Sequence, residues 1–342
     1  MPNKVITQAL DALASRRDLT AEQTSAVLAE VMAGNASEVE TAGVLVALRT
    51  KGETVDELVG LATTMRAFAT PVRTGRDDLI DTAGTGGGRP TFNVSTTAAL
   101  IAAAAGCAVA KHGNRSATGL SGSADVLEAL GVRIDLAPDA VARCITEVGF
   151  GFMFAPMHHG ATRFVVPVRR ELAVRTIFNF LGPLTNPAGA SRQLIGVSDP
   201  AFLETIAGAL ARLGARKALV VSSADGLDEM STSGTTRVVE VDGDQLRAYE
   251  IAPEDVGLAR TDSDAIGGGT PDVNAETTRR IFAGEPGPER DLAALNAGAA
   301  IYVAGRAESL EEGVRAAEAA LDDGRAAAAL ESLCSLTREL AA

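Results

Sequence analysis

Aromatic side chains are scarce in this sequence, which has no tryptophan and only two tyrosines among 342 residues. Hydrophobic residues nevertheless make up 46% of the chain, so aliphatic and alanine side chains must fill the interior. The length exceeds the usual size of a single domain. We therefore expect more than one domain and a sizeable core.

Cysteines and long hydrophobic runs are also rare. Cys107, Cys144 and Cys334 are odd in number and widely spaced, which argues against a disulfide framework or a zinc site, so we expect three reduced thiols. The longest apolar run, residues 98–110, is too short to cross a bilayer, and the N-terminus lacks the apolar stretch of a secretory signal. These absences predict a cytoplasmic protein.

Positive charge is in deficit, because 31 lysines and arginines stand against 44 acids and leave a formal net charge of −13. Such a balance disfavours binding to nucleic acid or to anionic membranes. An anionic small molecule would have to be met by local cations. The cations that lie in or beside polar motifs are Lys111, Arg115, Arg163, Arg169, Arg170 and Arg175.

Glycine, by contrast, is abundant, and it clusters in the segment D-T-A-G-T-G-G-G-R-P-T-F-N-V-S-T-T, residues 81–97. Glycines lack Cβ atoms, so backbone N–H groups there can approach a ligand, and Ser95 or Thr96 is expected to cap the following helix. The start of such a helix favours phosphate. The segment is not a Walker loop, because no G-K-[ST] follows, and Arg89 stands where a dinucleotide motif begun at Gly84 needs its last glycine. A purely structural turn is the alternative.

A second polar loop, K-H-G-N-R-S at residues 111–116, follows the apolar residues 107–110. It places several hydrogen-bond donors and two fixed positive charges within six residues. Because a purely structural turn rarely needs such a set, the second loop favours an anion-binding site over the structural alternative.

The first 70 residues predict a small helical domain. Capping-box patterns begin at Thr20, Ser37 and Thr54, each before an apolar-periodic stretch, and Gly34 and Gly52 stand where the first two of these helices should end. No strand-like alternation occurs before residue 78. We place the domain boundaries at residues 1–72 and 73–342.

The remainder alternates β-type and helical segments, which predicts an α/β fold with a mainly parallel central sheet and helices on its faces. The predicted strands are 79–81, 108–111, 132–135, 152–154, 194–197, 218–222 and 237–241. The predicted helices are 96–105, 123–130, 139–148, 163–179, 201–213 and 275–283, followed by two long helices within 293–342. Both polar loops, together with D-G-L-D-E at residues 225–229, should meet at the carboxyl edge of the sheet.

Asp228 and Glu229 are adjacent acids that follow a predicted strand. Two carboxylates together with phosphate oxygens suit Mg²⁺, which needs few protein ligands. A solvated turn with a helix-capping acid is the alternative. His158 and His159 are also adjacent, and this spacing is less suited to metal chelation than the i, i+4 spacing on a helix, so we predict no metal site there.

These motifs resemble the anthranilate phosphoribosyltransferase family over nearly the whole chain. After the two polar loops, four further motifs follow in the family's order. They are F-A-P-M-H-H-G-A-T-R (154–163), P-V-R-R-E-L (167–172), R-T-I-F-N-F-L-G-P-L-T-N-P (175–187) and D-G-L-D-E-M-S (225–231). The resemblance implies transfer of the phosphoribosyl group of phosphoribosyl pyrophosphate (PRPP) to the amine of anthranilate, a step of tryptophan biosynthesis. It also implies a fold of the nucleoside phosphorylase and phosphoribosyltransferase type, with residues 163–187 packed on the N-terminal helices.

The resemblance assigns roles to the residues of both loops. It implies that Lys111 acts electrostatically together with the acids, that no general base is needed, and that Ser95, Asp228 and Glu229 hold two Mg²⁺ ions per subunit. The anthranilate residues would be Gly84, His112, Asn114, His159 and Arg169. The PRPP residues would be Gly84, Thr85, Gly86, Gly87, Thr91, Asn93, Val94, Ser95, Thr96, Lys111, His112, Gly113, Asn114, Arg115 and Ser123. The family also pairs as a homodimer through its helical domain.

The chain departs from the family pattern in three places. An aspartate usually follows the glycines, but here Gly88, Arg89 and Pro90 occupy a shortened loop, and our hypothesis is that Arg89 meets a phosphate directly. Leu120 stands where a basic residue is common, and H-H-G-A-T-R replaces a tyrosine-histidine-proline start. On the surface, we expect Arg170 and Arg175 to pair with Glu171 and its neighbours.

Two other functions are considered. A pyrimidine-nucleoside-phosphorylase-like enzyme would carry a different lysine-serine loop, which K-H-G-N-R fits poorly. A catalytically silent paralogue that binds nucleic acid would conflict with the acidic balance and with the intact Asp228–Glu229 pair.

Overall fold

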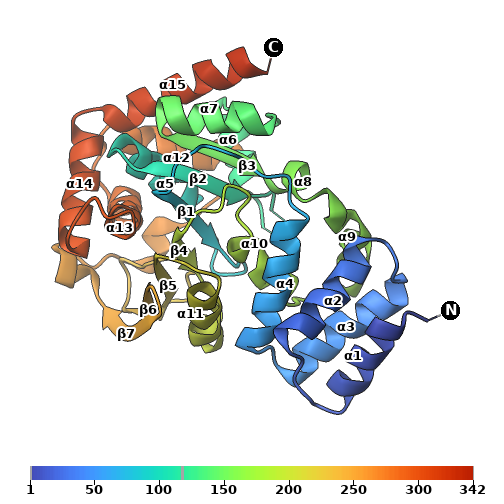
Figure 1. The fold of residues 1–342 in the computed structure, drawn as a ribbon. Helices are drawn as coiled ribbons and strands as arrows, with labels where there is room; N and C mark the ends of the chain where they lie inside the picture. The colour runs from blue at the N-terminus through green and yellow to red at the C-terminus, as the bar shows by residue number, and fades with distance from the viewer. Residues whose placement is uncertain (1, 117–118, 342) are drawn as a thin grey trace.

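A computed structural model of the protein describes residues 2–116 and 119–341, and Figure 1 shows its arrangement. A bundle of N-terminal helices, drawn in blue, lies beside a twisted sheet, and the C-terminal helices, drawn in orange and red, cover the far side. The N-terminal helices are α1 (Lys4–Ala14), α2 (Ala21–Met32), α3 (Glu38–Lys51) and α4 (Val55–Ala67). None of the helices in the described ranges is both long and apolar enough to cross a membrane.

Local capping sets the ends of these helices. Thr20, Ser37 and Thr54 each form the predicted capping box, in which the side chain of the cap and that of the residue three positions later bond to each other's backbone N–H groups. Gly52 ends α3 with a φ of 92°, a conformation that glycine adopts without strain. The sequence pattern did not reveal α1, because Asn3 caps it alone, without a second capping side chain.

The described residues form a seven-stranded sheet with the order β3-β2-β1-β4-β5-β6-β7. The pairs among β3, β2, β1, β4 and β5 are parallel, and β6 and β7 extend the sheet by antiparallel pairing. The strands are β1 (Leu79–Gly84), β2 (Ala108–Gly113), β3 (Phe150–Phe154), β4 (Arg192–Gly196), β5 (Lys217–Ser223), β6 (Thr236–Asp242) and β7 (Gln245–Ile251). The prediction of a mainly parallel sheet is confirmed.

Two strand predictions are wrong. Residues 132–135 form no strand, because the alternation there reflects Val132 and Ile134 packing into the core from an irregular connection. The strand β7 was missed because its side chains are mostly exposed and polar, so that no buried face produces an apolar pattern. It is an edge strand held by its ladder to β6.

The larger part of the chain supplies the helices that cover the sheet. They are α5 (Val94–Ala104), α6 (Ser123–Leu130), α7 (Pro138–Val148), α11 (Leu203–Arg212), α12 (Pro271–Phe282), α13 (Pro288–Val303), α14 (Leu310–Asp322) and α15 (Arg325–Leu340). Two long C-terminal helices were predicted, but this region holds three, with breaks at residues 304–309 and 323–324. The predicted helix at 201–213 begins with the short 3-10 turn η2 (Pro200–Phe202).

The predicted continuous helix at 163–179 is also wrong. This segment contains the 3-10 turn η1 (Gly160–Phe164) and α9 (Val166–Leu172), and it reaches only the start of α10 (Phe178–Leu184). Ala173 ends α9 in the left-handed region, with a φ of 51°. The short α8 (Ala155–His158) precedes them. Residues of α9 and α10 share a buried cluster with α1 to α4, as the family resemblance implied.

The sheet separates two buried clusters. In β4 and β5, Leu194 and Leu219 belong to the cluster with α5 and the C-terminal helices, whereas Ile195 and Val220 belong to the cluster with the N-terminal helices and α11. This alternation is the period of two that a strand covered on both faces requires. The sheet is therefore rigidly held, and its carboxyl edge is a fixed platform for the loops.

Candidate active site

The two polar loops and the acid pair follow neighbouring parallel strands. Strand β1 ends at Gly84, β2 at Gly113 and β5 at Ser223, and β1 lies between β2 and β4 in the sheet, with β5 beside β4. Because the carboxyl ends of parallel strands share one edge, the loops meet there. The predicted convergence is confirmed.

The glycines make room for a carboxylate of the protein itself. A Cβ atom on Gly88 would lie 2.4 Å from Oδ1 of Asp228, and one on Gly84 would lie 3.0 Å from Oδ2. Gly196, at the end of β4, is closer still, since its Cβ would lie 1.6 Å from the carbonyl oxygen of Asp228. The missing side chains at these glycines therefore leave the space that Asp228 occupies. At Gly86, which has a φ of 66°, a Cβ atom would meet no other atom within 4 Å.

The helix after the glycine loop starts differently from the prediction. Its N-cap is Asn93, in the left-handed conformation with a φ of 66°, and Ser95 and Thr96 lie in the first turn instead of capping it. Asparagine tolerates this conformation better than most residues. The Asn93 side chain makes no capping bond, and the backbone N–H of Ser95 in the first turn of α5 is directed to the carboxylate of Glu229.

The side chain of Asn93 makes three hydrogen bonds to the protein. Its Oδ1 accepts from Oγ of Ser121 at 2.8 Å and from Nδ2 of Asn274 at 2.8 Å, while its Nδ2 donates to the carbonyl of Ser121 at 3.0 Å. The side chain thus holds the left-handed turn and joins it to α12. One N–H of Nδ2 therefore holds the turn, and the second N–H is left for a ligand.

Lys111 lies within the sheet edge and is only 2% exposed. Its Nζ donates to the carbonyl of Thr82 at 2.5 Å and lies 3.4 Å from Oγ of Ser95. Burial lowers the pKa of Lys111, and the negative charges of Asp81 and Glu229 act against that shift. The structure therefore brings Lys111 and Ser95 together, with a positive charge at the start of α5.

The two acids lie in the same enclosed place. Burial raises the pKa of Glu229 to about 8, the neighbouring charge of Asp228 adds to the rise, and Lys111 and the backbone N–H of Ser95 oppose it. Burial also raises the pKa of Asp228. Within residues 2–116 and 119–341 no group of three or more His, Cys, Asp or Glu side chains could hold a metal. The predicted set of Ser95 with two acids therefore needs a substrate's oxygens to complete it.

Two buried histidines lie close together, one of them in the second polar loop. The rings of His112 and His159 have centroids 5.0 Å apart, and burial lowers the pKa of His112 to about 3 and that of His159 to about 4. Nδ1 of His112 lies 3.1 Å from the carbonyl of Gly182. That nitrogen must carry the proton, because a carbonyl only accepts. Nε2 of His112 is then a buried acceptor with no partner among the described residues.

Arg169 is the half-buried cation of α9. Its guanidinium stacks over the ring of Phe178, 5.6 Å from the centroid, and makes no hydrogen bond or ion pair among the described residues. Burial lowers its pKa. A half-buried cation of this kind is well suited to an anionic ligand.

Asn114, Arg115 and Ser123 lie together at the second loop but bond mainly to the protein. Nη1 of Arg115 pairs with Asp125 at 2.8 Å and with Glu128 at 2.5 Å, so its charge is largely compensated. Oγ of Ser123 donates to the carbonyl of Asn114 at 3.2 Å. A Cβ on Gly113 would lie 2.2 Å from this Oγ, which explains the small residue there.

Thr85, Thr91 and Val94 also lie in the glycine-rich segment 81–97, but groups predicted to bind PRPP contact the protein instead. Oγ1 of Thr85 accepts from the N–H of Ser198 at 3.3 Å, and the carbonyl of Thr91 packs against Gly268. Val94 is completely buried. Gly87 contacts Arg175, because a Cβ there would lie 1.7 Å from Nη1. Thr96 has a buried hydroxyl without a partner in the described chain.

Arg175 was assigned wrongly from the sequence. Its guanidinium donates to the carbonyls of Gly86 and Thr85 at 2.6 and 3.3 Å, and neither Arg170 nor Arg175 pairs with Glu171 in the part of the chain that is described. Gly196 and Ser198 were missed as well, although Oγ of Ser198 donates to Gly86 at 3.0 Å. Only their position could have marked them, since Gly196 lies near the end of the predicted strand 194–197 and Ser198 directly follows it.

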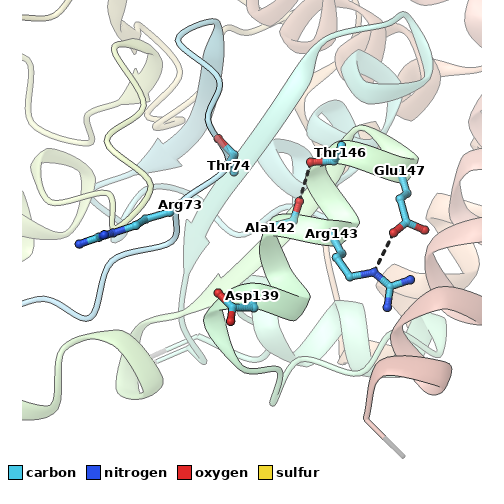
Figure 2. Close-up of a pocket in the computed structure, with 7 residues that line it drawn as sticks. All are labelled: Arg73, Thr74, Asp139, Ala142, Arg143, Thr146 and Glu147. Carbon is cyan, nitrogen blue, oxygen red and sulfur yellow. Dashed lines mark hydrogen bonds and ion pairs between the residues drawn. The ribbon is translucent and has the colours of Figure 1, made fainter.

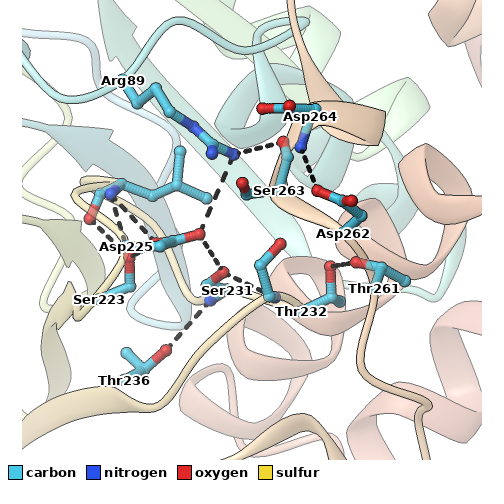
Figure 3. A network of polar contacts seen from close by, with 12 residues as sticks. Arg89, Ser223, Asp225, Ser231, Thr232, Thr236, Thr261, Asp262, Ser263 and Asp264 are labelled. Carbon is cyan, nitrogen blue, oxygen red and sulfur yellow. Dashed lines mark hydrogen bonds and ion pairs between the residues drawn. The ribbon is translucent and has the colours of Figure 1, made fainter.

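Arg89 also differs from the hypothesis. Its Nη2 donates to the carbonyl of Ser263 at 2.8 Å and lies 4.0 Å from Oδ2 of Asp225, as Figure 3 shows. The guanidinium is therefore bound by the protein.

Two surface hollows lie apart from these loops. The first, of about 260 Å³, is lined by Arg73 and Thr74 and by residues of α7 (Figure 2). The second, of about 380 Å³, lies among α6, α12 and α15. Neither is lined by a predicted site residue. The candidate site is therefore identified by the polar groups that converge at the carboxyl edge of the sheet, and not by the size of a cavity.

Comparison with known sequences and structures gives consistent matches. The helical bundle domain of a glycosyl transferase family matches residues 7–69, and the a/b domain of a glycosyl transferase family matches residues 76–327. Anthranilate phosphoribosyltransferase of Rubrobacter xylanophilus is 52% identical over 339 residues, which cover 98% of this chain and 99% of that protein. The Moorella thermoacetica protein of the same name is 50% identical over 91% of this chain and 92% of its own.

Solved structures agree. The crystal structure of anthranilate phosphoribosyltransferase from Thermus thermophilus has a TM-score of 0.92 and 48% identity, covering 96% of this chain and 99% of that one. The Saccharomyces cerevisiae enzyme in complex with PRPP and Mg has a TM-score of 0.89 over 98% of both chains. At 23% identity this second match shows the shared fold alone.

Proposed function

Since the chain belongs to the anthranilate phosphoribosyltransferases, a glycosyl transferase family, we propose that it transfers the phosphoribosyl group of PRPP to the amine of anthranilate. The products are N-(5-phosphoribosyl)anthranilate and pyrophosphate, in tryptophan biosynthesis. The observation that carries the proposal is the seating of Asp228 against Gly84 and Gly88, with Glu229 beside Lys111 and the backbone N–H of Ser95 at the start of α5.

The alternatives are not retained. Relatives about 50% identical over nearly the whole chain are anthranilate phosphoribosyltransferases, which leaves no support for a pyrimidine-nucleoside-phosphorylase-like enzyme. A silent nucleic-acid-binding paralogue would have no need for two adjacent half-buried acids with raised pKa values, because removing such groups from water is costly without a function.

The residues accommodate the leaving group. A bond forms between the amine nitrogen and C1 of the ribose while the bond from C1 to the pyrophosphate oxygen breaks, so negative charge accumulates on the pyrophosphate. The N–H groups at the start of α5 favour an anion, and Lys111 adds a positive charge 3.4 Å from Ser95. Charge stabilisation of this kind is commonly the largest catalytic contribution.

The acids fit magnesium. Carboxylate oxygens are the ligands that Mg²⁺ prefers, and one or two suffice when phosphates supply the rest. Burial and the neighbouring charge of Asp228 raise the pKa of Glu229, and a divalent cation would stabilise its charged form. We propose that Ser95, Asp228 and Glu229 would hold two Mg²⁺ ions per subunit, which when bound supply further neutralisation of the pyrophosphate charge. The yeast enzyme provides a precedent, since it binds PRPP with Mg.

The nucleophile needs positioning more than activation. An aromatic amine is neutral at neutral pH, so no general base is assigned, and its nitrogen loses one proton to solvent after the new bond forms. Neutral His112 has an acceptor at Nε2 that has no partner among the described residues, and it can orient an amine N–H. Orientation alone can lower a barrier by several kcal/mol, up to about 7–11 in model reactions.

Arg169 would bind the anthranilate carboxylate. Its guanidinium makes no polar bond within the described ranges and is backed by Phe178. A planar guanidinium meets a carboxylate with two parallel hydrogen bonds. Gly84, Asn114 and His159 would line the same position, and a related yeast structure contains 4-fluoroanthranilate. The PRPP residues remain as assigned from the sequence, with the completely buried Val94 acting through its backbone.

We also propose a homodimer formed through the helical domain, residues 1–72. Val39 is 82% exposed and Val46 is 41% exposed on α3, and Val5 of the adjacent α1 is 36% exposed. An exposed apolar surface of this kind is typical of an interface. Sedimentation or light scattering tests it, and a Val39→Glu, Val46→Glu variant should be monomeric.

Purified protein should consume anthranilate, followed by its fluorescence, only when Mg²⁺ and PRPP are both present. The Asp228→Asn, Glu229→Gln variant should be inactive while folding normally. A wild-type protein that consumes no anthranilate would contradict the function. Full activity of the double variant would contradict only the role of the acids.

A further inference from the structure

Three loops meet around Arg89. We call residues 84–90 the glycine loop, residues 223–231 the acid loop and residues 261–269 the third loop. The backbone N–H of Arg89 donates to the carbonyl of Gly226 at 3.0 Å, and its Nη2 donates to the carbonyl of Ser263 at 2.8 Å. One residue of the glycine loop therefore bonds to both of the other loops, as Figure 3 shows for the side chain.

Asp225 organises the acid loop from within. Its Oδ1 accepts from Oγ of Ser223, and its Oδ2 accepts from Oγ of Ser231 at 2.8 Å. Oδ1 also accepts from the N–H of Leu227 at 3.4 Å. This carboxylate thus joins both ends of the turn that carries Asp228 and Glu229. Its side chain is 14% exposed, so the charge needs a cation nearby.

Arg89 is that cation. Its Nη2 lies 4.0 Å from Oδ2 of Asp225, and its own side chain is 29% exposed. Among the described residues no other salt bridge to Asp225 is formed. Because removal of one partner of a largely buried pair leaves the other uncompensated, the two residues should act as a unit.

The third loop closes the arrangement. The N–H of Thr261 donates to the carbonyl of Thr232 at 2.9 Å, and the two hydroxyls lie 2.9 Å apart. Gly268 packs against the backbone of Thr91, where a Cβ would lie 2.0 Å from the carbonyl oxygen. The third loop therefore contacts Thr232, which follows the acid loop, and Thr91, which follows the glycine loop. Together with the bonds of Arg89, these contacts connect each of the three loops to the other two.

We propose that Arg89 is a positioning residue, which through Asp225 holds the acid loop against the glycine loop and so sets the site for magnesium and PRPP. The inference rests on the proposed function and deepens it. The shortened glycine loop places a cation where it binds the protein, and the diphosphate is met by other groups. Arg89 acts through Asp228 and Glu229 and does not touch the substrate.

A direct phosphate contact by Arg89 predicts different results, and binding of PRPP in the presence of Mg²⁺, measured by calorimetry, separates the two. If Arg89 positions the acid loop, Arg89→Ala should weaken binding by about 10-fold or more, as loss of outer partners of metal ligands does. Asp225→Asn should weaken binding similarly, and the double variant should be no worse than either single one. Arg89→Lys should restore part of the affinity, because it retains the charge.

The kinetic readout is the Michaelis constant. Both single variants should raise the Mg²⁺ concentration for half-maximal rate and KM for PRPP, leaving KM for anthranilate unchanged. Arg133→Ala is the matched control, because Arg133 pairs with Asp135 on the exposed surface. Thermal unfolding midpoints close to the wild type in Arg89→Lys and Asp225→Asn show that the fold is retained.

Two results would overturn the inference. One is an Asp225→Asn variant that binds PRPP as the wild type does while Arg89→Ala is weakened, since a direct contact would survive loss of Asp225. The other is a double variant whose loss equals the product of the single losses. Both presuppose an active wild type, so an inactive wild type would contradict the proposed function instead.

Discussion

The guanidinium of Arg175 donates a hydrogen bond of 2.6 Å to the carbonyl of Gly86, across 89 positions of the chain. The backbone carbonyl of Arg175 in turn accepts from Nη1 of Arg49 on α3. A continuous set of contacts therefore runs from the N-terminal helices to the glycine loop. The conformation of this loop depends on the seating of the helical bundle.

Replacing Arg175 by alanine should weaken PRPP binding. The loop would lose two hydrogen bonds from a charged donor, each typically worth about 1.5–3 kcal/mol, part of which solvent would replace. We expect kcat/KM for PRPP to fall about 10-fold, with KM for anthranilate unchanged. Steady-state kinetics checks this, and Arg163→Ala is the control, because Arg163 is exposed and stacks only on Phe164. Equal kinetics in the two variants would contradict the role.

Arg169→Lys should raise KM for anthranilate by about 10-fold or more. Lysine keeps the positive charge but cannot form two parallel hydrogen bonds to a carboxylate, and a lost charged hydrogen bond costs about 1.5–3 kcal/mol. The measurement is anthranilate binding by fluorescence. Arg170→Lys, on the exposed side of the same helix, should bind anthranilate normally, and a parallel loss in both variants would rule out the assignment.

Magnesium affinity should rise with pH up to about 8. Since burial raises the pKa of Glu229 to about 8, the folded protein keeps a proton that the unfolded chain releases near pH 4.5, and stability without metal should fall between these values. Mg²⁺ must displace this proton. Calorimetric titration of Mg²⁺ with PRPP present should show affinity that increases toward pH 8 and then levels.

The Glu229→Gln variant supplies the comparison for that titration. It cannot lose a proton at this position, so the part of the pH dependence that comes from the protein should disappear and only that of PRPP should remain. Identical pH profiles for the variant and the wild type would show that Glu229 is not a metal ligand.

The buried histidines should destabilise the fold in acid. The pKa of His159 is lowered to about 4 and that of His112 to about 3, below the unfolded value of about 6.5. Their contribution is complete above pH 6.5 and is lost as the pH falls toward 4 and 3. For His159 alone we expect a loss of about 2 kcal/mol at pH 5.

Denaturant unfolding at pH 7.5 and pH 5 measures this loss. In His159→Asn, the fall in unfolding free energy between pH 7.5 and pH 5 should be smaller by the part that His159 contributes. The control is Arg133→Ala, which removes an exposed surface pair with Asp135 and should behave as the wild type. A His159 resonance that titrates near pH 6.5 in the folded protein would contradict the burial argument.

Much of the fold follows from local patterns. Thr20, Ser37 and Thr54 start helices as predicted, because each cap bonds to groups three residues away and needs no distant partner. Buried strands such as β4 and β5 are recognisable, because both faces are covered and their central residues are apolar. The strand β7 was not predicted, because its exposed residues do not form an apolar pattern in the sequence.

The sequence by itself determined the family, the helical and α/β parts and the meeting of the polar loops, because these depend on residue type, local capping and the shared edge of parallel strands. The tertiary structure alone decided that Asn93 caps α5, that Arg175 holds Gly86 and that Arg89 pairs with Asp225. Each of these contacts is one of several that the residue could make with donors or acceptors distant in the sequence. Which contact forms depends on which atoms the packed sheet and helices bring within about 3–4 Å.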